Sequence, residues 1–166
     1  MSVEINPASF QDKAVLRQLM ELYLYDFSEF DQADVDEHGY YGYWYLDNNW
    51  TEEERSPFLV RVSGKLAGFV LVRRINEPGQ PVTHAISEFF IMKKYRRQGV
   101  GRQVARLIFD RFPGLWQVCQ EEANLPAQRF WRQVIAEYIH GDYKEELVEG
   151  GHWRGPCQEF DNQKRG

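Results

Sequence analysis

The spacing of hydrophobic residues along the 166-residue chain predicts alternating strands and helices. Apolar or alternating runs rich in β-branched and aromatic residues are typical of strands, and apolar residues three and four apart are typical of helices. The expected strands are 3–5, 57–62, 66–74, 86–92, 115–120, 143–148 and 157–160. The expected helices are one with Val15, Leu16, Leu19, Met20, Leu22 and Tyr23 on its apolar side, a short one at 44–46, one at 100–112 and one at 125–136.

Cap and turn residues separate these elements. Ser9 is a suitable N-cap for the first helix. The sequence 63–65 (Ser-Gly-Lys) joins two strands in a hairpin, and 113–114 (Pro-Gly) ends the helix that starts near Val100. Residues 47–49 (Asp-Asn-Asn) are typical of a loop. The resulting order is strand, helices, three strands, helix, strand, helix and two strands, which indicates an α/β protein.

A basic, glycine-containing turn at 95–102 lies between the buried strand 86–92 and the following helix. Seven Lys or Arg residues lie between Lys93 and Arg111, against the single carboxylate of Asp110. A strand, a Gly-x-Gly turn and a helix gather free backbone N–H groups at a helix N-terminus, where an anion is favoured. The segment is therefore either a phosphate site or a solvated basic helix that follows a turn.

Two other phosphate motifs do not fit this turn. A P-loop requires Gly-Lys-Ser/Thr, and Gly101 is followed by Arg102 and Gln103. A dinucleotide fingerprint requires a third glycine, which is missing. The spacing Arg96-x-x-Gly99-x-Gly101 resembles instead the acetyl-CoA signature of the GCN5-related N-acetyltransferases, the GNAT superfamily.

A second motif supports this resemblance. Asn124-x-x-Ala127-x-x-Phe130-Trp131 is similar to the family's Asn-x-x-Ala motif and its apolar-aromatic pair. Motif-level resemblance covers about 88–136, and the first half resembles the family only in element order. The resemblance implies a single GNAT-like α/β (α+β) domain over residues 1–166. Its mixed, mostly antiparallel sheet of about six or seven strands would be flanked by about four helices and splayed between the fourth and fifth strands.

The resemblance also implies where acetyl-CoA binds. The backbone amides of the turn would cradle the pyrophosphate, and Arg96, Arg97 and Arg102 would screen its charge. The backbone of Phe90 and Ile91 would pair with the pantetheine arm like an added strand. Asn124 would either touch the cofactor or cap the helix that follows it. The cofactor-binding residues expected on these grounds are Phe90, Ile91, Arg96, Arg97, Gln98, Gly99, Val100, Gly101, Arg102 and Asn124.

Amine acylation needs a base for the amine and a proton for the leaving thiolate. The resemblance makes Glu88 the candidate base, although a strand-end carboxylate paired with a neighbouring Arg is an equal alternative. His84, with matching parity on the same strand, is a weaker candidate. Many family members carry a tyrosine acid where this chain has Trp131, whose indole is no acid. Tyr138 is the substitute candidate for the acid, and Trp131 supports the alternative of a non-catalytic acyl-CoA-binding or regulatory module.

The resemblance also implies that the acceptor side lies in the divergent first half, because the helices after the first strand usually close the substrate cleft in this family. Residues 26–54 contain ten carboxylates, no Lys or Arg, and many aromatic residues. Carboxylates and aromatic faces both bind cations, so the expected acceptor is a primary amine of a small cationic molecule or of a protein. Most of these acids are equally explained as a solvated face. Asp26, Glu29, Tyr41 and Trp44 are the substrate-binding candidates.

Composition bears on nucleic-acid binding, on the state of the cysteines and on the cellular location. The chain is 43% apolar and 15% aromatic, and its net charge of −5 argues against general nucleic-acid binding. Cys119 and Cys157 lack CxxC or Cys/His spacing, so they are interpreted as two lone cysteines, with Cys119 a reduced core residue. Neither a signal peptide nor an 18-residue apolar stretch is found. The expectation is a cytoplasmic protein without a membrane segment or a metal, and a homodimer is left open.

Overall fold

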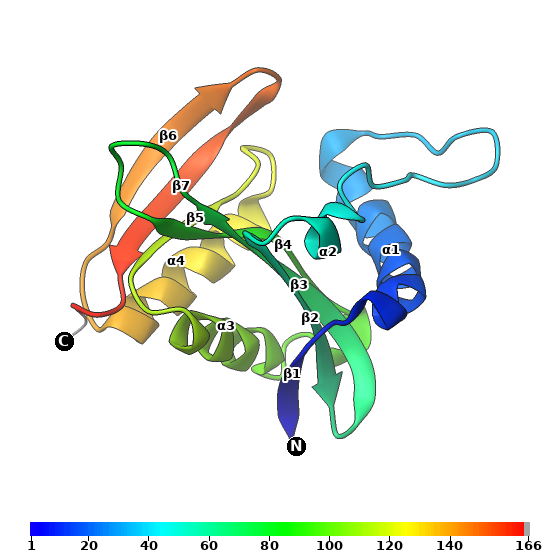
Figure 1. Ribbon diagram of the computed structural model, residues 1–166, viewed down its shortest axis with the longest axis horizontal. Coiled ribbons are helices and arrows are strands. Elements are labelled where there is room, and N and C mark those ends of the chain that lie inside the picture. The colour runs from blue at the N-terminus through cyan, green and yellow to red at the C-terminus, as the bar shows by residue number, and fades with distance from the viewer. Residues whose placement is uncertain (165–166) are drawn as a thin grey trace.

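Seven strands form one mixed sheet in the computed structural model, which describes residues 1–164 (Figure 1). The strands are β1 (Val3–Pro7), β2 (Arg55–Val62), β3 (Lys65–Ile75), β4 (Thr83–Ile91), β5 (Leu115–Cys119), β6 (Lys144–Gly150) and β7 (Trp153–Asp161). Their order across the sheet is β1-β2-β3-β4-β5-β7-β6, and only β4 and β5 are parallel. The predicted mixed, mostly antiparallel sheet is therefore confirmed.

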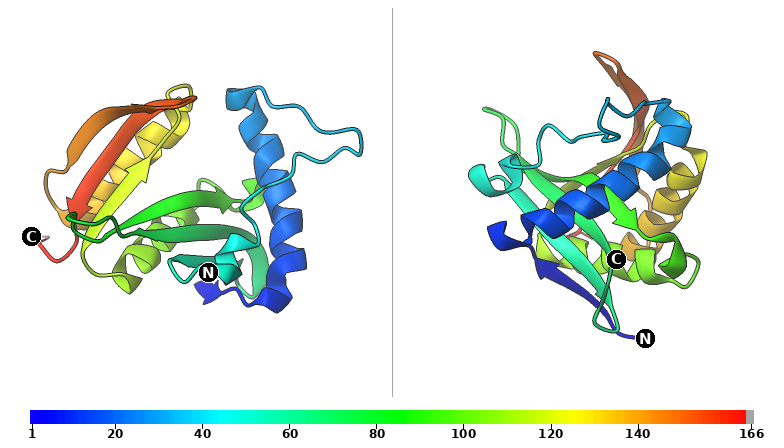
Figure 2. Two further views of the ribbon diagram at one scale, coloured as in Figure 1. Left: turned by 45° about the horizontal axis from the view of Figure 1, so that its top comes forward. Right: turned by 90° about the vertical axis from the view of Figure 1, so that its right-hand side faces the viewer.

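Helices cover both faces of this sheet (Figure 2). They are α1 (Lys13–Asp31), α2 (Asn48–Thr51), α3 (Val100–Arg111) and α4 (Leu125–Ile139), with 3₁₀ turns at Phe10–Asp12 and Lys93–Tyr95. One hydrophobic cluster joins the sheet to α3 and α4, and a second joins its opposite face to α1 and to the segment around α2. Leu16 of α1 and Val104 of α3 are fully enclosed in these two layers.

The sheet opens between β4 and β5. Their parallel pairing is limited to three pairs, which end at Ala85 opposite Gln117. Beyond that point β5 continues beside β7, while β4 continues beside β3 alone. Residues 86–91 of β4 therefore have no strand partner on the side of the opening, and the predicted splay is confirmed.

A β-bulge lies in the same part of β4. Leu71 pairs with Glu88 and Val72 pairs with Ile86, so Ser87 is the extra residue of the bulge. A bulge shifts the inward and outward alternation of side chains by one position. Ile86 and Phe89 consequently face the α3–α4 layer, whereas Glu88 faces the α1 layer.

The segment between α1 and β2 differs from its prediction. The short helix is Asn48–Thr51, where a loop was expected, and 44–46 is a turn. The side-chain amide of Asn49 is buried and donates to the Leu46 carbonyl at 3.0 Å. The Trp50 indole donates to the Ala8 carbonyl at 3.0 Å. These two hydrogen bonds favour a helical turn that the local sequence does not indicate. Leu22 of α1, expected in the core, is exposed.

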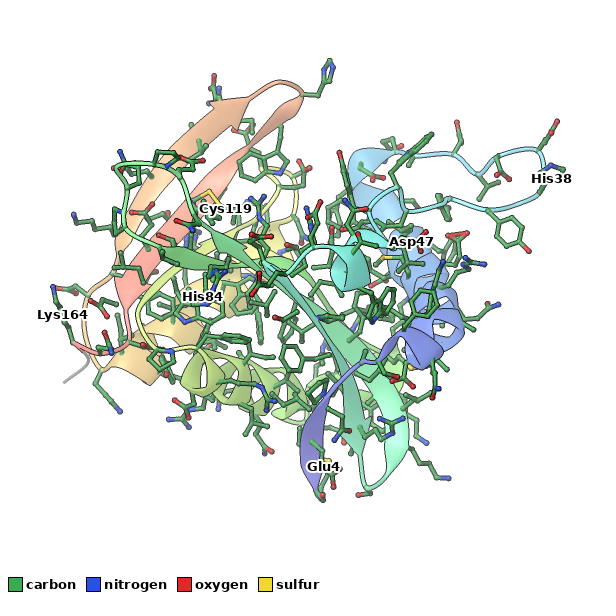
Figure 3. All side chains as sticks on the ribbon, viewed as in Figure 1. Glu4, His38, Asp47, His84, Cys119 and Lys164 are labelled. Carbon is green, nitrogen blue, oxygen red and sulfur yellow. A yellow bond between two sulfur atoms is a disulfide. The ribbon has the colours of Figure 1, made fainter. Side chains whose placement is uncertain are left out.

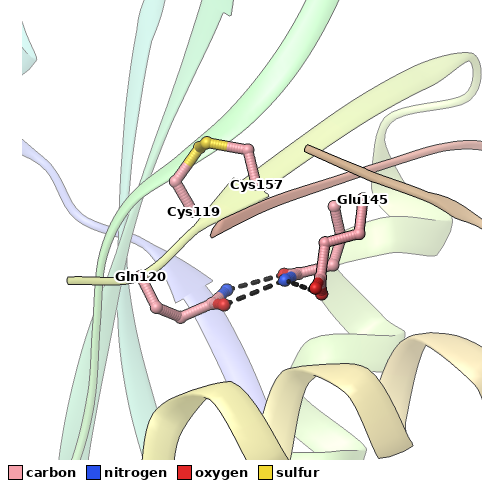
Figure 4. Close-up of a disulfide and its surroundings, with 5 residues drawn as sticks. Cys119, Gln120, Glu145 and Cys157 are labelled. Carbon is pink, nitrogen blue, oxygen red and sulfur yellow. Dashed lines mark hydrogen bonds between the residues drawn. A yellow bond between two sulfur atoms is a disulfide. The ribbon is translucent and has the colours of Figure 1, made fainter. Parts of the chain in front are cut away.

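The prediction of two lone cysteines is wrong. Cys119 and Cys157 lie directly opposite each other on β5 and β7 and form a disulfide, with Cα atoms 4.1 Å apart (Figure 4). The spacing of 38 residues along the chain gave no indication of this pairing, because strand register is a tertiary property. Beside the bond, the buried amides of Gln120 and Gln158 exchange hydrogen bonds of 2.7 and 3.0 Å. Gln158 also donates to Glu145 of β6 at 2.8 Å.

We expect reduction of this disulfide to destabilise the fold. Closing a loop of this length removes chain entropy from the unfolded state, which corresponds to about 4 kcal/mol in the chain-entropy account. Urea unfolding with and without a thiol reductant should show the difference. A Cys119→Ser/Cys157→Ser variant is the control and should unfold at the same urea concentration in both conditions. Two reactive thiols in the denatured, unreduced protein would contradict the pairing.

Candidate functional site

The turn after β4 begins α3 in a geometry suited to an anion. Gly99, the N-cap of α3, has a φ of +80°, which is the left-handed region that favours glycine. Val100 is buried and fixes the first turn of the helix against the core. The first N–H groups of an α-helix have no partner within the helix and carry the positive end of its dipole. The turn therefore presents backbone donors together with a basic segment.

The second glycine of the turn has a different role. A Cβ atom at Gly101 would lie 3.2 Å from two ring carbons of Phe130 on α4, whereas one at Gly99 would meet no atom of residues 1–164 within 4 Å. Gly101 thus permits the close approach of α3 and α4, in addition to any space that it leaves for a ligand. Gly99 is required by its backbone conformation.

A cavity of about 670 Å³ extends from this turn along the open edge of β4. Its walls come from α1, the end of β4, the basic turn and the first half of α4. Ten predicted site residues line it: Asp26, Glu29, Phe90, Ile91, Arg96, Arg97, Gly99, Gly101, Arg102 and Asn124. The predicted residues that do not line it are Tyr41, Trp44, Glu88, Gln98, Val100 and Tyr138.

Arg96 connects the basic turn to α1. Its Nε donates to the Ile91 carbonyl at 2.7 Å, and its guanidinium donates to the Asp26 carboxylate at 2.6 Å. Lys93 lies 3.6 Å from the other oxygen of Asp26. Two cations therefore neutralise Asp26, which does not favour its expected role as a ligand of the acceptor amine. Arg96 holds the two walls of the cavity together.

The other arginines of the turn are more exposed. Arg102 forms an ion pair of 3.0 Å with Glu137 of α4. Arg97 is exposed, has a φ of +60° and forms no ion pair within residues 1–164. Arg97 is therefore the cation on the cavity that is best placed to meet a bound phosphate.

Asn124 lies at the start of α4 and on the wall of the cavity. Its Oδ1 accepts the Ala127 N–H at 3.1 Å and so caps the N-terminus of α4, and the residue also lines the cavity. Pro126 in the first turn leaves no backbone N–H at that position. The cavity consequently touches the N-termini of both α3 and α4.

Glu88 is enclosed by tyrosines, and none of the arginines within residues 1–164 forms the ion pair with it that one alternative had expected. The hydroxyl of Tyr23 on α1 donates to one carboxylate oxygen, and that of Tyr43 donates to the other at 3.4 Å. Burial raises the pKa of Glu88 to about 7, although the two hydrogen bonds oppose this shift. Burial and the nearby carboxylate also raise the pKa of both tyrosines. This arrangement gives a carboxylate whose proton affinity suits a general base near neutral pH.

His84 does not share a face with Glu88, contrary to the expected parity. The bulge at Ser87 reverses the alternation, so the His84 ring lies on the opposite face, 4.9 Å from Phe112 and 5.5 Å from Trp116 (Figure 3). Burial lowers the pKa of His84, and Arg74 lowers it further. His84 is a packing residue in this structure.

Tyr138 is buried beyond the cavity wall. Its hydroxyl donates to Asp110 of α3 at 2.6 Å, and its ring packs on Phe109 at 5.1 Å. Tyr138 does not line the cavity in which a thioester would bind, and this does not favour its expected role as general acid. Trp131, in contrast, does line the cavity, with its ring 4.8 Å from Phe89.

Two acceptor candidates lie in the long loop after α1, which extends outward to His38 (Figure 3). The backbone N–H of Tyr41 donates to Glu21 at 2.7 Å, which anchors the loop to α1, and Trp44 is 94% exposed. Glu29 is the acidic candidate that lies on the cavity without a hydrogen bond to Arg96.

Sequence reasoning missed the aromatic wall of the cavity. Tyr23, Phe27 and Phe30 of α1 line it together with Phe89 and Phe130. The first three are four and three residues apart, which is the spacing of one helix face. That spacing was a usable signal, but it is equally typical of a helix packed in a core.

The comparisons with known proteins agree with this geometry. Residues 16–134 match the sequence model described as the acetyltransferase (GNAT) family, which is most of the chain. The chain therefore belongs to the GNAT acetyltransferase family. No curated protein matched it significantly. None of the helices within residues 1–164 has the length and apolarity needed to cross a bilayer, and no group of three His, Cys, Asp or Glu residues there could hold a metal ion.

Solved structures with the same fold are distant in sequence. An acetyltransferase from Thermus thermophilus has a TM-score of 0.68 and 14% identity, with 97% of each chain covered. The aminoglycoside acetyltransferase AAC(6')-Ib in complex with coenzyme A has a TM-score of 0.69 and 15% identity over 98% of this chain and 96% of that one. The PaiA N-acetyltransferase from Thermoplasma acidophilum, also with coenzyme A, has a TM-score of 0.62 and 13% identity over 97% and 99%. At these identities the likeness establishes the fold.

The raised pKa of Glu88 predicts a pH-dependent stability. The pKa of Glu88 is higher in the folded protein than in the unfolded chain. The protonated carboxyl therefore contributes to the free energy of unfolding below pH 4.5, and this contribution is lost as the pH rises toward about 7. A shift of this size corresponds to about 3 kcal/mol. The Glu88→Gln variant does not titrate, so urea unfolding should show its stability rising relative to wild type between pH 4.5 and 7. If the free energies of unfolding of the variant and the wild type differ by a constant amount across this pH range, the burial of an ionisable Glu88 is contradicted.

Proposed function

We propose that this protein is an acetyl-CoA-dependent N-acetyltransferase that acylates a primary amine of a small cationic molecule or of a protein. One observation carries the proposal: a single cavity joins the basic N-terminus of α3 to the open edge of β4 and to Tyr23, whose hydroxyl bonds to Glu88. Binding of a phosphate-bearing donor and removal of a proton can therefore be combined in one space.

The residues on the cavity fit acetyl-CoA in their chemistry. The N–H groups of the first turn of α3 and the side chain of Arg97 suit its phosphates. The backbone of Phe89 and Phe90, on the edge of β4 that no longer pairs with β5, can accept an extended amide-containing arm as an additional strand. The rings of Phe89 and Phe130, 5.9 Å apart, provide an apolar wall for that arm. Bound there, acetyl-CoA would supply the acyl group as a thioester.

The acceptor side is formed by α1. Glu29 provides a carboxylate on the cavity, and the rings of Phe27 and Phe30, 6.0 Å apart, provide faces that attract a cation. An amine reacts only when it is neutral, so it must lose its proton near this wall. Glu88 is the base in this proposal, because its pKa of about 7 lets it be ionised and still take up a proton.

A second candidate function is a non-catalytic module that binds acyl-CoA. Trp131 occupies the position where the resemblance expects a tyrosine acid, and Tyr138 bonds to Asp110 away from the cavity. Calorimetry with acetyl-CoA, combined with a thiol-release assay on a panel of primary amines, separates the two functions. Binding with release supports the enzyme, and binding without release supports the module.

We expect acetyl-CoA at one hundred times its Kd to stabilise the protein by about 2.7 kcal/mol. Arg97→Gln should weaken binding roughly two- to fivefold, since an exposed charge contributes at most about 1 kcal/mol. Arg106→Gln is the matched control, because Arg106 is an exposed arginine of α3 that does not line the cavity. Calorimetry at low and high salt should show that the difference in acetyl-CoA affinity between the two variants becomes smaller as the ionic strength rises. If both variants lose the same acetyl-CoA affinity, the phosphates do not bind beside Arg97.

Glu88→Gln should reduce kcat/KM by about 10² to 10⁴, the usual contribution of a general base. Acetyl-CoA affinity should not change, because Glu88 does not line the cavity. The pH profile of kcat/KM should lose the limb that reports deprotonation at about pH 7. Wild-type rates in this variant from about pH 6 to about pH 9, on both sides of the expected pKa, would make Glu88 a structural residue.

A further inference from the structure

Tyr23 stands between Glu88 and the cavity. The Tyr23 residue lines the cavity, and its hydroxyl donates to Glu88, which does not line it. The second hydrogen bond to Glu88 comes from Tyr43, which also does not line the cavity. Tyr23 therefore connects the cavity to the carboxylate of Glu88.

The Tyr23 ring is held in one place. It packs edge-on against Phe69 at 5.6 Å and lies 5.6 Å from Phe90 and 5.8 Å from Phe27. Arg96, through Asp26, ties the same helix to the end of β4. Rings on three elements therefore keep the hydroxyl aimed at Glu88.

The chemistry of a phenol suits a relay at this point. A tyrosine hydroxyl has one proton to donate and two lone pairs that can accept. The proton is committed to Glu88, so a lone pair is available for an N–H in the cavity. Burial and the adjacent carboxylate raise the pKa of Tyr23. The phenol thus stays protonated at neutral pH and can pass a proton on without accumulating as a phenolate.

We propose that Tyr23 is a catalytic residue of the acyl transfer, receiving a proton from the acceptor nitrogen while its own hydroxyl proton moves to Glu88. The inference rests on the proposed function. The new N–C bond forms as the C–S bond breaks, and the ammonium loses two protons in all. One passes through Tyr23 to Glu88 and then to solvent, and the equivalent of the other is taken by the departing sulfur from water.

Tyr43 provides the matched comparison. It bonds to the other oxygen of the same carboxylate, from the loop after α1. The other charged groups around the pair are Asp31 near Tyr23, and Arg55 and Arg73 near Tyr43. Loss of either hydroxyl removes one hydrogen bond to Glu88, but only loss of the Tyr23 hydroxyl interrupts the path from the cavity.

The test compares Tyr23→Phe with Tyr43→Phe in pH profiles of kcat/KM for a primary amine, measured by thiol release. Tyr23→Phe should lower kcat/KM by about 10² or more and flatten the limb at about pH 7. Tyr43→Phe should lower kcat/KM less than about tenfold. It should also move the limb at about pH 7 to higher pH, because the hydrogen bond from the Tyr43 hydroxyl lowers the pKa of Glu88 and is lost in this variant. Calorimetry should show similar acetyl-CoA affinity in both variants.

The outcomes separate the two proposals. An active wild type with equal effects of the two substitutions overturns the relay and leaves the enzyme proposal intact. A wild type that releases no thiol with any amine of the panel overturns both. If Tyr23→Phe does not fold, rates of the wild type in mixtures of H₂O and D₂O decide. Two protons in flight give a curved dependence on the deuterium fraction, and a linear dependence overturns the relay.

Discussion

The interruption of backbone pairing along β4 is the constraint on which the site depends. Three parallel pairs hold β4 to β5, and after Ala85 the edge is unpaired. Unpaired backbone groups in a protein need partners from water or a ligand, so the open edge defines a place where an extended molecule can bind. The bulge at Ser87 on the other side of the strand turns Glu88 toward α1. The cavity and its candidate base both originate in this irregular part of one strand.

Helix α1 completes the site because polar and aromatic contacts hold it over β4. The Asp26–Arg96 ion pair and the hydrogen bond from Arg96 to Ile91 join the helix to the strand end. The Tyr23 ring of the same helix packs against Phe69 of β3 and Phe90 of β4. A carboxylate enclosed in this way cannot be solvated well, and its pKa rises accordingly. Packing and acid–base chemistry are thus two consequences of the same contacts.

The cavity is lined by charged groups of both signs. The α3 end carries the helix N-terminus with Arg97 and Arg102, which favour an anion. The α1 end carries Glu29 and aromatic rings, which favour a cation. An anionic group is therefore favoured beside the basic turn, and a cationic group is favoured beside Glu29.

The element order, the family and the basic turn could be predicted from the amino-acid sequence, because they depend on local patterns. Periodicity, turn residues and the spacing of Gly99, Gly101 and Asn124 depend on neighbours a few positions away. The Cys119–Cys157 disulfide, the face of His84 and the partners of Glu88 could not be predicted in this way. Strand register, a single bulged residue and a helix packed across the sheet control these features. Each depends on contacts between residues far apart in the chain, which no local pattern records.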